Sequence, residues 1–300
     1  MASSPQSRAD APWTTRRLLG WIGSALASAG VDAPRVCAEL LVAHVLGCDR
    51  LRLYADPDRP TTPAERSELR ALVSRALQHE PVQYLVGEAW FFSMPFRVDR
   101  RVLIPRPETE LLVEAVVQAA RDRKELAAGA IADLGTGSGC IIVAALKHLP
   151  RARGLAVDRS ADALQVARIN ADRHGVEDRL DFLTGDLYEP LDEHPAGRRL
   201  AALLANPPYI ADPEWADVAA NVRQEPESAL RGGADGLDLI RPILAGASER
   251  LAPGGLFALE FGAGQTDAVL ALAEAEPGLT AARIESDFEG RPRALVTTRA

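Results

Sequence analysis

The sequence predicts a doubly wound, mostly parallel α/β sheet preceded by a small all-helical domain. Up to about Glu80 the apolar residues keep the i, i+3, i+4 spacing of one helix face. Beyond Pro105, short apolar runs of strand length alternate with helical segments, which is typical of a parallel sheet. The 300 residues also exceed the usual size of one domain. We therefore expect two domains.

The N-terminal region is expected to form a helical bundle joined to the sheet by a hairpin. Pro34 marks a helix start, and the Pro-rich stretch at 55–63 marks a break. Residues 89–105 combine aromatic and β-branched residues with turn chemistry, as in a hairpin. We assign three segments: a helical domain (1–85), a hairpin linker (86–105) and the α/β domain (106–300).

Seven apolar runs are expected to supply the strands of the sheet. The last two runs lie close enough in sequence to pair antiparallel, whereas helical segments separate most of the others. The runs are found at 130–135, 154–158, 180–186, 200–206, 255–262, 282–288 and 293–299.

Composition and charge exclude several classes of protein. No apolar run approaches the ~18 residues of a membrane span. The N-terminal segment lacks a signal-peptide core, and Asp10 is unusual in a transit peptide, so we expect a cytoplasmic protein with no membrane partner.

Residues 1–80 carry a net charge of +1 and the other 220 residues carry −9. An acidic domain is a poor match for a polyanion, so no direct nucleic-acid partner is expected. The three cysteines and five histidines lack metal-binding spacing, so no metal is expected.

The segment "DLGTGSGC" closes the first strand of the sheet and opens a helix. Its glycines, Gly135, Gly137 and Gly139, allow a tight turn and a close approach to a ligand. A dinucleotide-binding loop would need glycine where the chain has Cys140. Asp158 ends the second strand, where a carboxylate can bind both hydroxyls of a ribose. The expected ligand is a nucleoside without a diphosphate, and S-adenosylmethionine fits this description.

Two further predictions concern the ends of the next strands. Asp186, or Leu187 after it, follows the third strand and is expected to meet an adenine ring. The fourth strand ends in Asn206-Pro207-Pro208-Tyr209. Both residues that precede a proline are pushed toward extended conformations, so the loop is stiff.

This proline loop is suited to bind an –NH₂ group. The Asn206 side-chain oxygen and the Pro207 carbonyl can together accept both hydrogens of one amino or amide nitrogen. Two acceptors arranged in this way favour the pyramidal nitrogen, whose lone pair can attack an electrophilic methyl group. Tyr209 offers a flat face to a planar substrate. The sequence therefore predicts methyl transfer to a planar –NH₂ group.

With these residues described, the chain closely resembles the protein-glutamine methyltransferases of the PrmC/HemK family, over essentially its full length. The motifs that carry the resemblance are "RPETE" (106–110), "DLGTGSGC", "LLANPPYI" and "RQEPESALRGGADGLDLI". The resemblance implies a seven-stranded Rossmann-like methyltransferase sheet. It also implies that peptide chain release factors are the protein substrate and that the N-terminal domain helps to grip them.

The resemblance further assigns roles to individual residues. Those implied to contact S-adenosylmethionine are Gly135, Thr136, Gly137, Ser138, Gly139, Asp158, Leu187 and Asn206. Asp186 joins this group from its position at the end of the third strand. Those implied to bind the glutamine of the factor's Gly-Gly-Gln motif are Asn206, Pro207, Pro208 and Tyr209, with Asn206, Pro207 and Tyr209 as the catalytic group. Arg106 and Glu108 of the "RPETE" motif are expected to be further substrate-binding residues. At Leu187 some relatives carry an aromatic residue, which would stack on the adenine.

Three other functions stay open at this point. A related branch methylates a glutamine of a large-subunit ribosomal protein, but that branch lacks the "RPETE" motif. Enzymes that methylate amino groups of nucleic acids share the N-P-P-Y motif, yet the acidic sheet domain disfavours them. A binding module that uses the cofactor site without turnover is the non-enzymatic alternative, and the presence of Asn206 argues against it.

Overall fold

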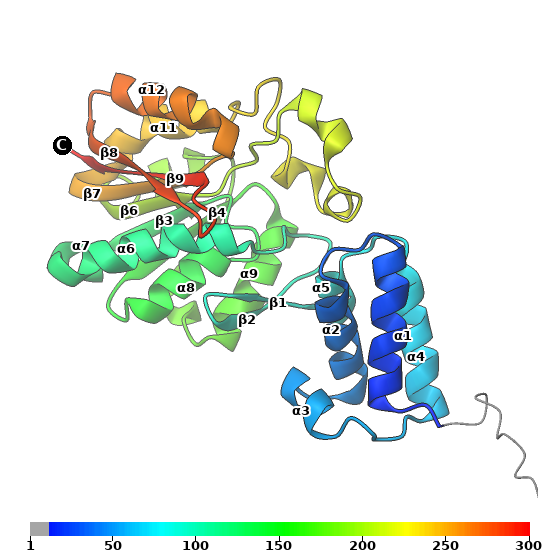
Figure 1. The fold of residues 1–300 in the computed structure, drawn as a ribbon. Helices are drawn as coiled ribbons and strands as arrows, with labels where there is room; N and C mark the ends of the chain where they lie inside the picture. The colour runs from blue at the N-terminus through cyan, green and yellow to red at the C-terminus, as the bar shows by residue number, and fades with distance from the viewer. Residues whose placement is uncertain (1–11) are drawn as a thin grey trace, which may run out of the picture. The chain divides into compact units, whose positions relative to one another are not determined.

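The computed structural model describes residues 12–300, which form two compact units (Figure 1). The helical unit comprises residues 12–87 and 220–224, and the sheet unit comprises residues 88–219 and 225–300. The expectation about a targeting peptide rests partly on residues 1–11, which lie outside the described residues. Within residues 12–300, no helix has both the length and the apolar character needed to cross a membrane.

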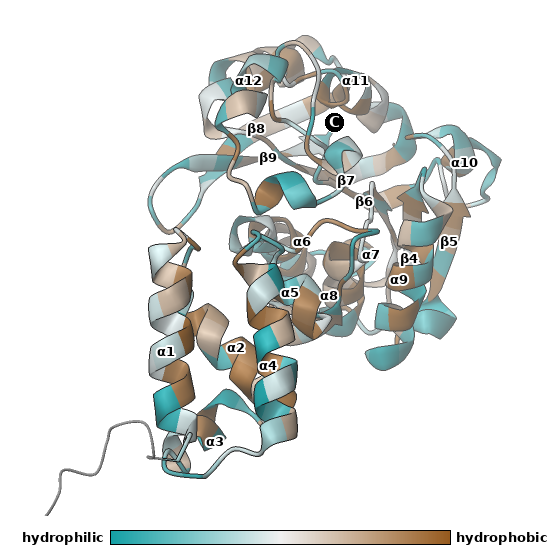
Figure 2. Cartoon of the chain, turned by 90° about the vertical axis from the view of Figure 1, so that its right-hand side faces the viewer, coloured by the Kyte–Doolittle hydropathy of each residue, from teal (hydrophilic) through white to brown (hydrophobic). Residues whose placement is uncertain are grey.

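Five α-helices within residues 12–87 enclose a core of their own. Thr62 and Glu65 form a capping box at the start of α4, and a proline occupies its first turn, so local sequence fixes this helix start. Figure 2 shows the hydrophobic sides of α1, α2 and α4 turned toward one another. The helices are α1 (Thr15–Ser28), α2 (Pro34–Leu46), α3 (Arg50–Ala55), α4 (Pro63–Ala76) and α5 (Val82–Val86). The predicted helix start at Pro34 and the break at 55–63 are confirmed.

The sheet unit is built on seven strands in the order β5-β4-β3-β6-β7-β9-β8. The first five strands in this order are parallel to one another. Strand β9 runs antiparallel between β7 and β8, so the predicted antiparallel pairing of the last two strands is confirmed. The strands are β3 (Ala130–Leu134), β4 (Arg153–Asp158), β5 (Leu180–Thr184), β6 (Leu200–Ala205), β7 (Leu251–Glu260), β8 (Leu279–Ser286) and β9 (Pro292–Arg299).

Helices cover both faces of the sheet, as predicted for a doubly wound fold. Alternate residues of one strand enter opposite cores: Ile131 packs in the core under α6 and α8, and Ala132 packs in the core under α11 and α12. Strand β6 is buried at all six positions, as expected for a central parallel strand. The α-helices are α6 (Glu110–Asp122), α7 (Lys124–Ala128), α8 (Cys140–His148), α9 (Ala161–Arg173), α10 (Glu189–Glu193), α11 (Ile240–Arg250) and α12 (Thr266–Ala275).

A short hairpin, β1 (Glu88–Phe91) and β2 (Met94–Arg97), precedes the sheet in sequence. The aromatic run predicted this hairpin. Its two-residue turn, Phe92 and Ser93, has positive φ at both positions, as a type I′ turn requires. Short 3₁₀ helices complete the chain: η1 (Pro107–Thr109), η2 (Glu177–Arg179), η3 (Asp212–Asp217), η4 (Val222–Gln224), η5 (Glu227–Ala229) and η6 (Ala263–Gln265).

Candidate active site

A cavity of about 260 Å³ lies in the sheet unit, lined by residues that follow the carboxyl ends of β3, β4, β5 and β6. This edge is where open α/β sheets bind their ligands. Eight of the predicted site residues line the cavity: Gly135, Gly137, Asp158, Asp186, Leu187, Asn206, Pro207 and Pro208. Thr136, Ser138 and Gly139 are not among its lining residues, although they belong to the same loop.

Hydrogen bonds and close packing hold the glycine loop, and they account for the loop residues that do not line the cavity. The Thr136 hydroxyl donates to Asp133 Oδ2 at 2.6 Å, and both side chains are buried. Gly139 has φ of +79°, and a Cβ there would lie 3.0 Å from the Ala167 Cβ, so the loop meets α9 at a point where only glycine fits. These residues therefore shape the loop.

Asp158 is positioned to bind a diol. Its Oδ2 accepts a hydrogen bond from Gly137 N at 2.9 Å, and its Oδ1 accepts one from Ser160 N at 2.8 Å. Each carboxylate oxygen keeps a further lone pair. The two backbone donors fix the carboxylate at the cavity wall, where the remaining lone pairs suit the two hydroxyls of a ribose. The residues present therefore fit a nucleoside ligand.

Leu187 has φ of +44°, a conformation that is strained for any residue with a β-carbon. It lines the cavity beside Asp186 and next to the apolar side chains of Leu239 and Ile243. Such strain persists only where the surroundings hold it, and it is concentrated at binding sites. The adenine position expected from the sequence lies at this apolar wall, and it stays a prediction.

A second, smaller cavity of about 40 Å³ adjoins the first, and both are lined by Leu103, Asn206 and Ala229. One water molecule needs roughly 10–15 Å³ of cavity volume, so the small cavity has room for about three non-hydrogen atoms. A carboxamide group has three. Arg106, Tyr209 and Glu260 also line it. Asn206 therefore lies where the large cavity meets a pocket of carboxamide size.

The proline loop after β6 is braced by the glycine-rich segment 230–236. The ladder pairs of β6 with β3 and β7 end at Ala205, so the Pro207 carbonyl lies beyond the sheet. Ile210 N donates to Leu230 O, and Gly232 N donates to Ile210 O, both at 2.9 Å. At Gly236, which has φ of +77°, a Cβ would lie 2.3 Å from the Tyr209 carbonyl oxygen. This close approach explains the glycine at position 236.

Asn206 and Tyr209 are each held by one side-chain hydrogen bond. Asn206 Nδ2 donates to Thr109 Oγ1 at 3.1 Å, so Oδ1 is the side-chain atom left to face the cavities. The Tyr209 hydroxyl donates to Glu260 Oε1 at 3.2 Å. Burial, followed by the neighbouring Glu260 carboxyl, raises the pKa of Tyr209 well above its usual range. The tyrosine stays neutral and cannot act as a base.

Two buried carboxyl groups at this edge were missed by the sequence reasoning. Asp133 precedes the last residue of β3, and Glu260 is the last residue of β7. Burial raises the pKa of each to about 7. Asp133 Oδ1 and Glu260 Oε2 have no hydrogen-bond partner within the described part of the chain. Both acids end apolar strands, so the rule that found Asp158 would also have found them.

The raised pKa of Glu260 leads to a stability prediction. The folded protein holds this proton more tightly than the unfolded chain, whose value is 4.5, so the stabilising contribution is complete below about pH 4.5 and is lost as pH rises through 7. Glu260→Gln removes the titration. Relative to wild type, its free energy of unfolding should rise by about 2–3 kcal/mol between pH 5 and pH 8, as measured by urea denaturation. A difference that stays flat with pH would contradict this.

Of the two "RPETE" residues that the sequence assigns to substrate binding, Arg106 lines the small cavity and Glu108 lines neither cavity. Arg106 lines the small cavity and forms an ion pair with Glu225, whose side chain is almost fully buried. Glu225 Oε2 also accepts a hydrogen bond from Ile104 N at 2.9 Å, which fixes the segment that leads into the motif. Glu108 is among the lining residues of neither cavity, and its nearest cation, Arg291, lies 3.9 Å away. Sequence reasoning missed Glu225.

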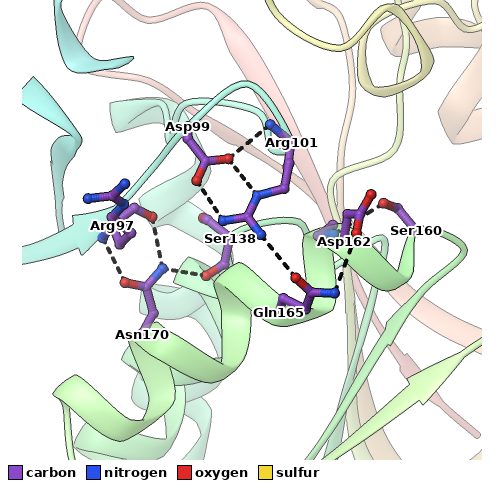
Figure 3. Close-up of polar contacts among 9 residues, drawn as sticks. Arg97, Asp99, Arg101, Ser138, Ser160, Asp162, Gln165 and Asn170 are labelled. Atoms are coloured by element: carbon purple, nitrogen blue, oxygen red, sulfur yellow. Dashed lines mark hydrogen bonds and ion pairs between the residues drawn. The ribbon is translucent and has the colours of Figure 1, made fainter. Parts of the chain in front are cut away.

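Asn170 on α9 ties the last residue of β2 to the glycine loop (Figure 3). Its Oδ1 accepts from Arg97 N at 2.7 Å, and its Nδ2 donates to Arg97 O at 3.0 Å and to Ser138 O at 2.8 Å. Arg101 hydrogen-bonds to both Asp99 and Gln165. Residues 100–103 line one wall of the large cavity. The hydrogen bonds at Arg97 and at Arg101 hold the chain that leads into this wall.

Removal of the Asn170 carboxamide should destabilise the sheet unit. Asn170 is fully buried, and Asn170→Ala leaves three backbone polar groups unpaired. We expect the free energy of unfolding to fall by about 2–4 kcal/mol in urea denaturation. Gln165→Ala is the matched control, because that side chain is exposed, and its effect should stay within about 0.5 kcal/mol. Equal effects of the two variants would show that Asn170 is not an anchor.

No cluster of three or more His, Cys, Asp or Glu side chains that could hold a metal ion occurs within residues 12–300.

Two family models match the chain. The PrmC N-terminal domain matches residues 17–87, and the methyltransferase small domain matches residues 107–235. Among solved structures, the catalytic domain of hMettl16 in complex with a MAT2A 3′UTR hairpin has a TM-score of 0.52 and 16% identity, covering 68% of this chain and 74% of that chain. This likeness concerns the fold alone, and it agrees with the predicted Rossmann-like methyltransferase sheet.

Curated relatives are similar over nearly the whole chain. The release factor glutamine methyltransferase of Geobacter sulfurreducens is 41% identical over 261 residues, covering 87% of this chain and 88% of the relative. That of Moorella thermoacetica is 41% identical over 286 residues, covering 95% of this chain and 99% of the relative. The resemblance stated from the motifs is confirmed. The chain belongs to the release factor glutamine methyltransferase family.

Proposed function

We propose that this protein transfers the methyl group of S-adenosylmethionine to the side-chain amide of the Gly-Gly-Gln glutamine in peptide chain release factors. The observation that carries the proposal is the position of Asn206, at the boundary between a nucleoside cavity and a pocket of carboxamide size. The curated relatives are named for this reaction. The ribosomal-protein and nucleic-acid alternatives have no comparable support.

The large cavity would hold S-adenosylmethionine, which supplies an electrophilic methyl group on a sulfonium when bound. Asp158 accepts hydrogen bonds from the ribose hydroxyls, and Leu187 packs against the adenine with Asp186 beside it. Gly135, Gly137 and Gly139 give the loop its turn, while Thr136 and Ser138 hold it from behind. Asn206 borders both cavities and therefore contacts both ligands.

The proline loop would prepare the amide nitrogen for attack. An amide nitrogen shares its lone pair with the carbonyl, and full loss of this delocalisation costs about 18–20 kcal/mol. Only part of this has to be overcome, because the Asn206 Oδ1 and Pro207 carbonyl accept both N–H groups and favour a pyramidal nitrogen. Tyr209 and Pro208 flank the planar group. The N–C bond forms as the S–C bond of the sulfonium breaks, and the methylated nitrogen then loses its surplus proton to solvent, so no strong base is needed.

We further propose a separate role for each of the three segments of the chain. The N-terminal domain (1–85) grips the release factor, the hairpin (86–105) links it to the methyltransferase domain (106–300), and Arg106 and Glu108 contribute to substrate binding. The protein acts in the cytoplasm, where release factors work.

The proposal is tested by transfer of labelled methyl groups from S-adenosylmethionine to purified release factor. A factor whose Gly-Gly-Gln glutamine is changed to Ala is the matched control. Label on the intact factor alone is the expected result. Label on both factors, or on ribosomal protein or nucleic acid in place of the factor, would overturn the choice of substrate.

A further inference from the structure

One buried carboxyl oxygen at the small cavity has no hydrogen-bond partner within residues 12–300. Glu260 lines this cavity together with Asn206 and Tyr209, and it is 1% exposed. The Tyr209 hydroxyl donates to Glu260 Oε1 at 3.2 Å, whereas Oε2 is unpaired. Buried polar atoms are rarely left unpaired in a folded protein. Oε2 is therefore an atom that a ligand in the small cavity can satisfy.

The glutamine side chain brings one polar atom that the proline loop does not satisfy. In the proposed function, Asn206 Oδ1 and the Pro207 carbonyl accept the two N–H groups of the amide. The carbonyl oxygen of the amide is left over, and it can only accept hydrogen bonds. Binding therefore needs a donor at the other end of the carboxamide, because a buried oxygen without one weakens the complex.

The donors among the side chains that line the small cavity are few. Asn206 Nδ2 and the Tyr209 hydroxyl already have acceptors within the protein. Arg106 is paired with Glu225. A carbonyl oxygen has two lone pairs, so Arg106 can serve one of them and leave the other for Glu260. Because Oε1 already accepts from Tyr209, the unpaired Oε2 is the oxygen that can carry a proton and donate it.

We propose that Glu260 is a further substrate-binding residue, whose Oε2 donates a hydrogen bond to the side-chain carbonyl oxygen of the incoming glutamine. This assignment rests on the proposed function and adds the second end of the carboxamide to the recognised group. Acceptors at one end and a donor at the other fix the orientation of a group whose two ends are alike in shape. An ionised Glu260 would instead place an acceptor against the carbonyl oxygen, and the two would repel each other.

The surroundings of Glu260 allow it to hold this proton near neutral pH. Burial raises its pKa to about 7, the charge of Glu108 on η1 acts in the same direction, and Arg293 on β9 acts against it. Burial also raises the pKa of Tyr209 beyond its usual range and that of the Cys140 thiol on α8 to about 12, so both neighbours are uncharged. A bound carbonyl oxygen pairs only with the protonated form, so substrate binding should raise the pKa of Glu260 further.

The test measures KM for the release factor in methyl transfer at saturating S-adenosylmethionine, between pH 6 and pH 9. Glu260→Met keeps the length of the side chain and removes both oxygens. At pH 6 its KM should lie about 10- to 100-fold above that of wild type. Its kcat should stay within about threefold, because the contact is present before and during methyl transfer. Urea denaturation of the same samples shows that the variant is folded.

Glu260→Gln supplies a donor that does not titrate. Tyr209 holds Oε1 as an acceptor, so the Nε2 group takes the place of the protonated Oε2. The KM of wild type should rise about 10- to 100-fold from pH 6 to pH 9, as Glu260 loses its proton, whereas the KM of Glu260→Gln should stay within about threefold.

Asp133→Asn is the matched control for the pH profile. Asp133 is an equally buried strand-end acid with an unpaired oxygen, and burial raises its pKa to about 7 as well. It lines neither cavity, so the rise of KM with pH should persist in Asp133→Asn.

The outcomes separate this assignment from the proposed function. If wild type labels the factor and Glu260→Met has the same KM, or if the rise of KM with pH persists in Glu260→Gln, Glu260 does not bind the glutamine. Should Glu260→Met fail to fold, the pH profiles of wild type and Glu260→Gln decide. A release factor that wild type leaves unlabelled would overturn the proposed function, and the role of Glu260 with it.

Discussion

Asn206→Ala is expected to lower kcat for methyl transfer about 100- to 1,000-fold, the loss seen when one preorganised polar group is removed from an active site. The substitution removes the acceptor Oδ1 from the boundary between the two cavities and leaves only the Pro207 carbonyl to hold the substrate nitrogen. The free energy of unfolding should change by about 1 kcal/mol or less, because one hydrogen bond, that to Thr109, is lost.

The measurement is steady-state transfer of labelled methyl groups to the release factor, alongside urea denaturation of the same samples. Gln165→Ala serves as the control, because it truncates an exposed carboxamide that lines neither cavity. Its kcat should stay within about twofold of wild type. If Asn206→Ala retains most of its activity while folded, the proline loop is not the site of nitrogen binding.

Asp158→Ala is expected to weaken binding of S-adenosylhomocysteine about 100-fold in isothermal titration calorimetry. The ribose loses its acceptors, and Gly137 N and Ser160 N lose their partner, so the loop is no longer held in its binding shape. A loss of about 1–3 kcal/mol per charge-assisted interaction corresponds to a factor of this size.

Asp162→Ala is the matched variant for this experiment. Asp162 is an exposed acid a few residues further along the chain, and it is not among the lining residues of the large cavity. The Asp162→Ala variant should bind S-adenosylhomocysteine with the affinity of the wild-type protein. Equal affinities for Asp158→Ala and wild type would place the ribose elsewhere and would remove the argument for the large cavity as the cofactor site.

Much of the fold could be predicted because its signals are local. Strand-length apolar runs, such as that of β6, are buried on both faces, and the alternation of Ile131 and Ala132 sends neighbouring residues into opposite cores. The helix start at Pro34 follows from the preference of proline for the first turn of a helix. The antiparallel pairing of β8 and β9 follows from the short chain between them. The large cavity follows as well, because carboxyl ends of neighbouring parallel strands share one edge.

The supporting residues could not be predicted, because their partners are distant in sequence. Thr109 and Asn206 are 97 positions apart, and Ile104 and Glu225 are 121 positions apart. A single buried Asn170 gives no periodic signal, yet it joins the end of β2 and the glycine loop, which lie 73 and 32 positions away in sequence. Such contacts depend on the packing of the whole unit, which no local pattern encodes.

The most direct test of the account is a crystal structure of the protein with S-adenosylhomocysteine and a peptide that contains Gly-Gly-Gln. We expect the glutamine side-chain nitrogen to lie about 2.7–3.2 Å from both Asn206 Oδ1 and the carbonyl oxygen of Pro207, with the sulfur of the cofactor on its open side. A glutamine whose carbonyl oxygen occupies that position, or whose side chain lies outside the small cavity, would contradict the account.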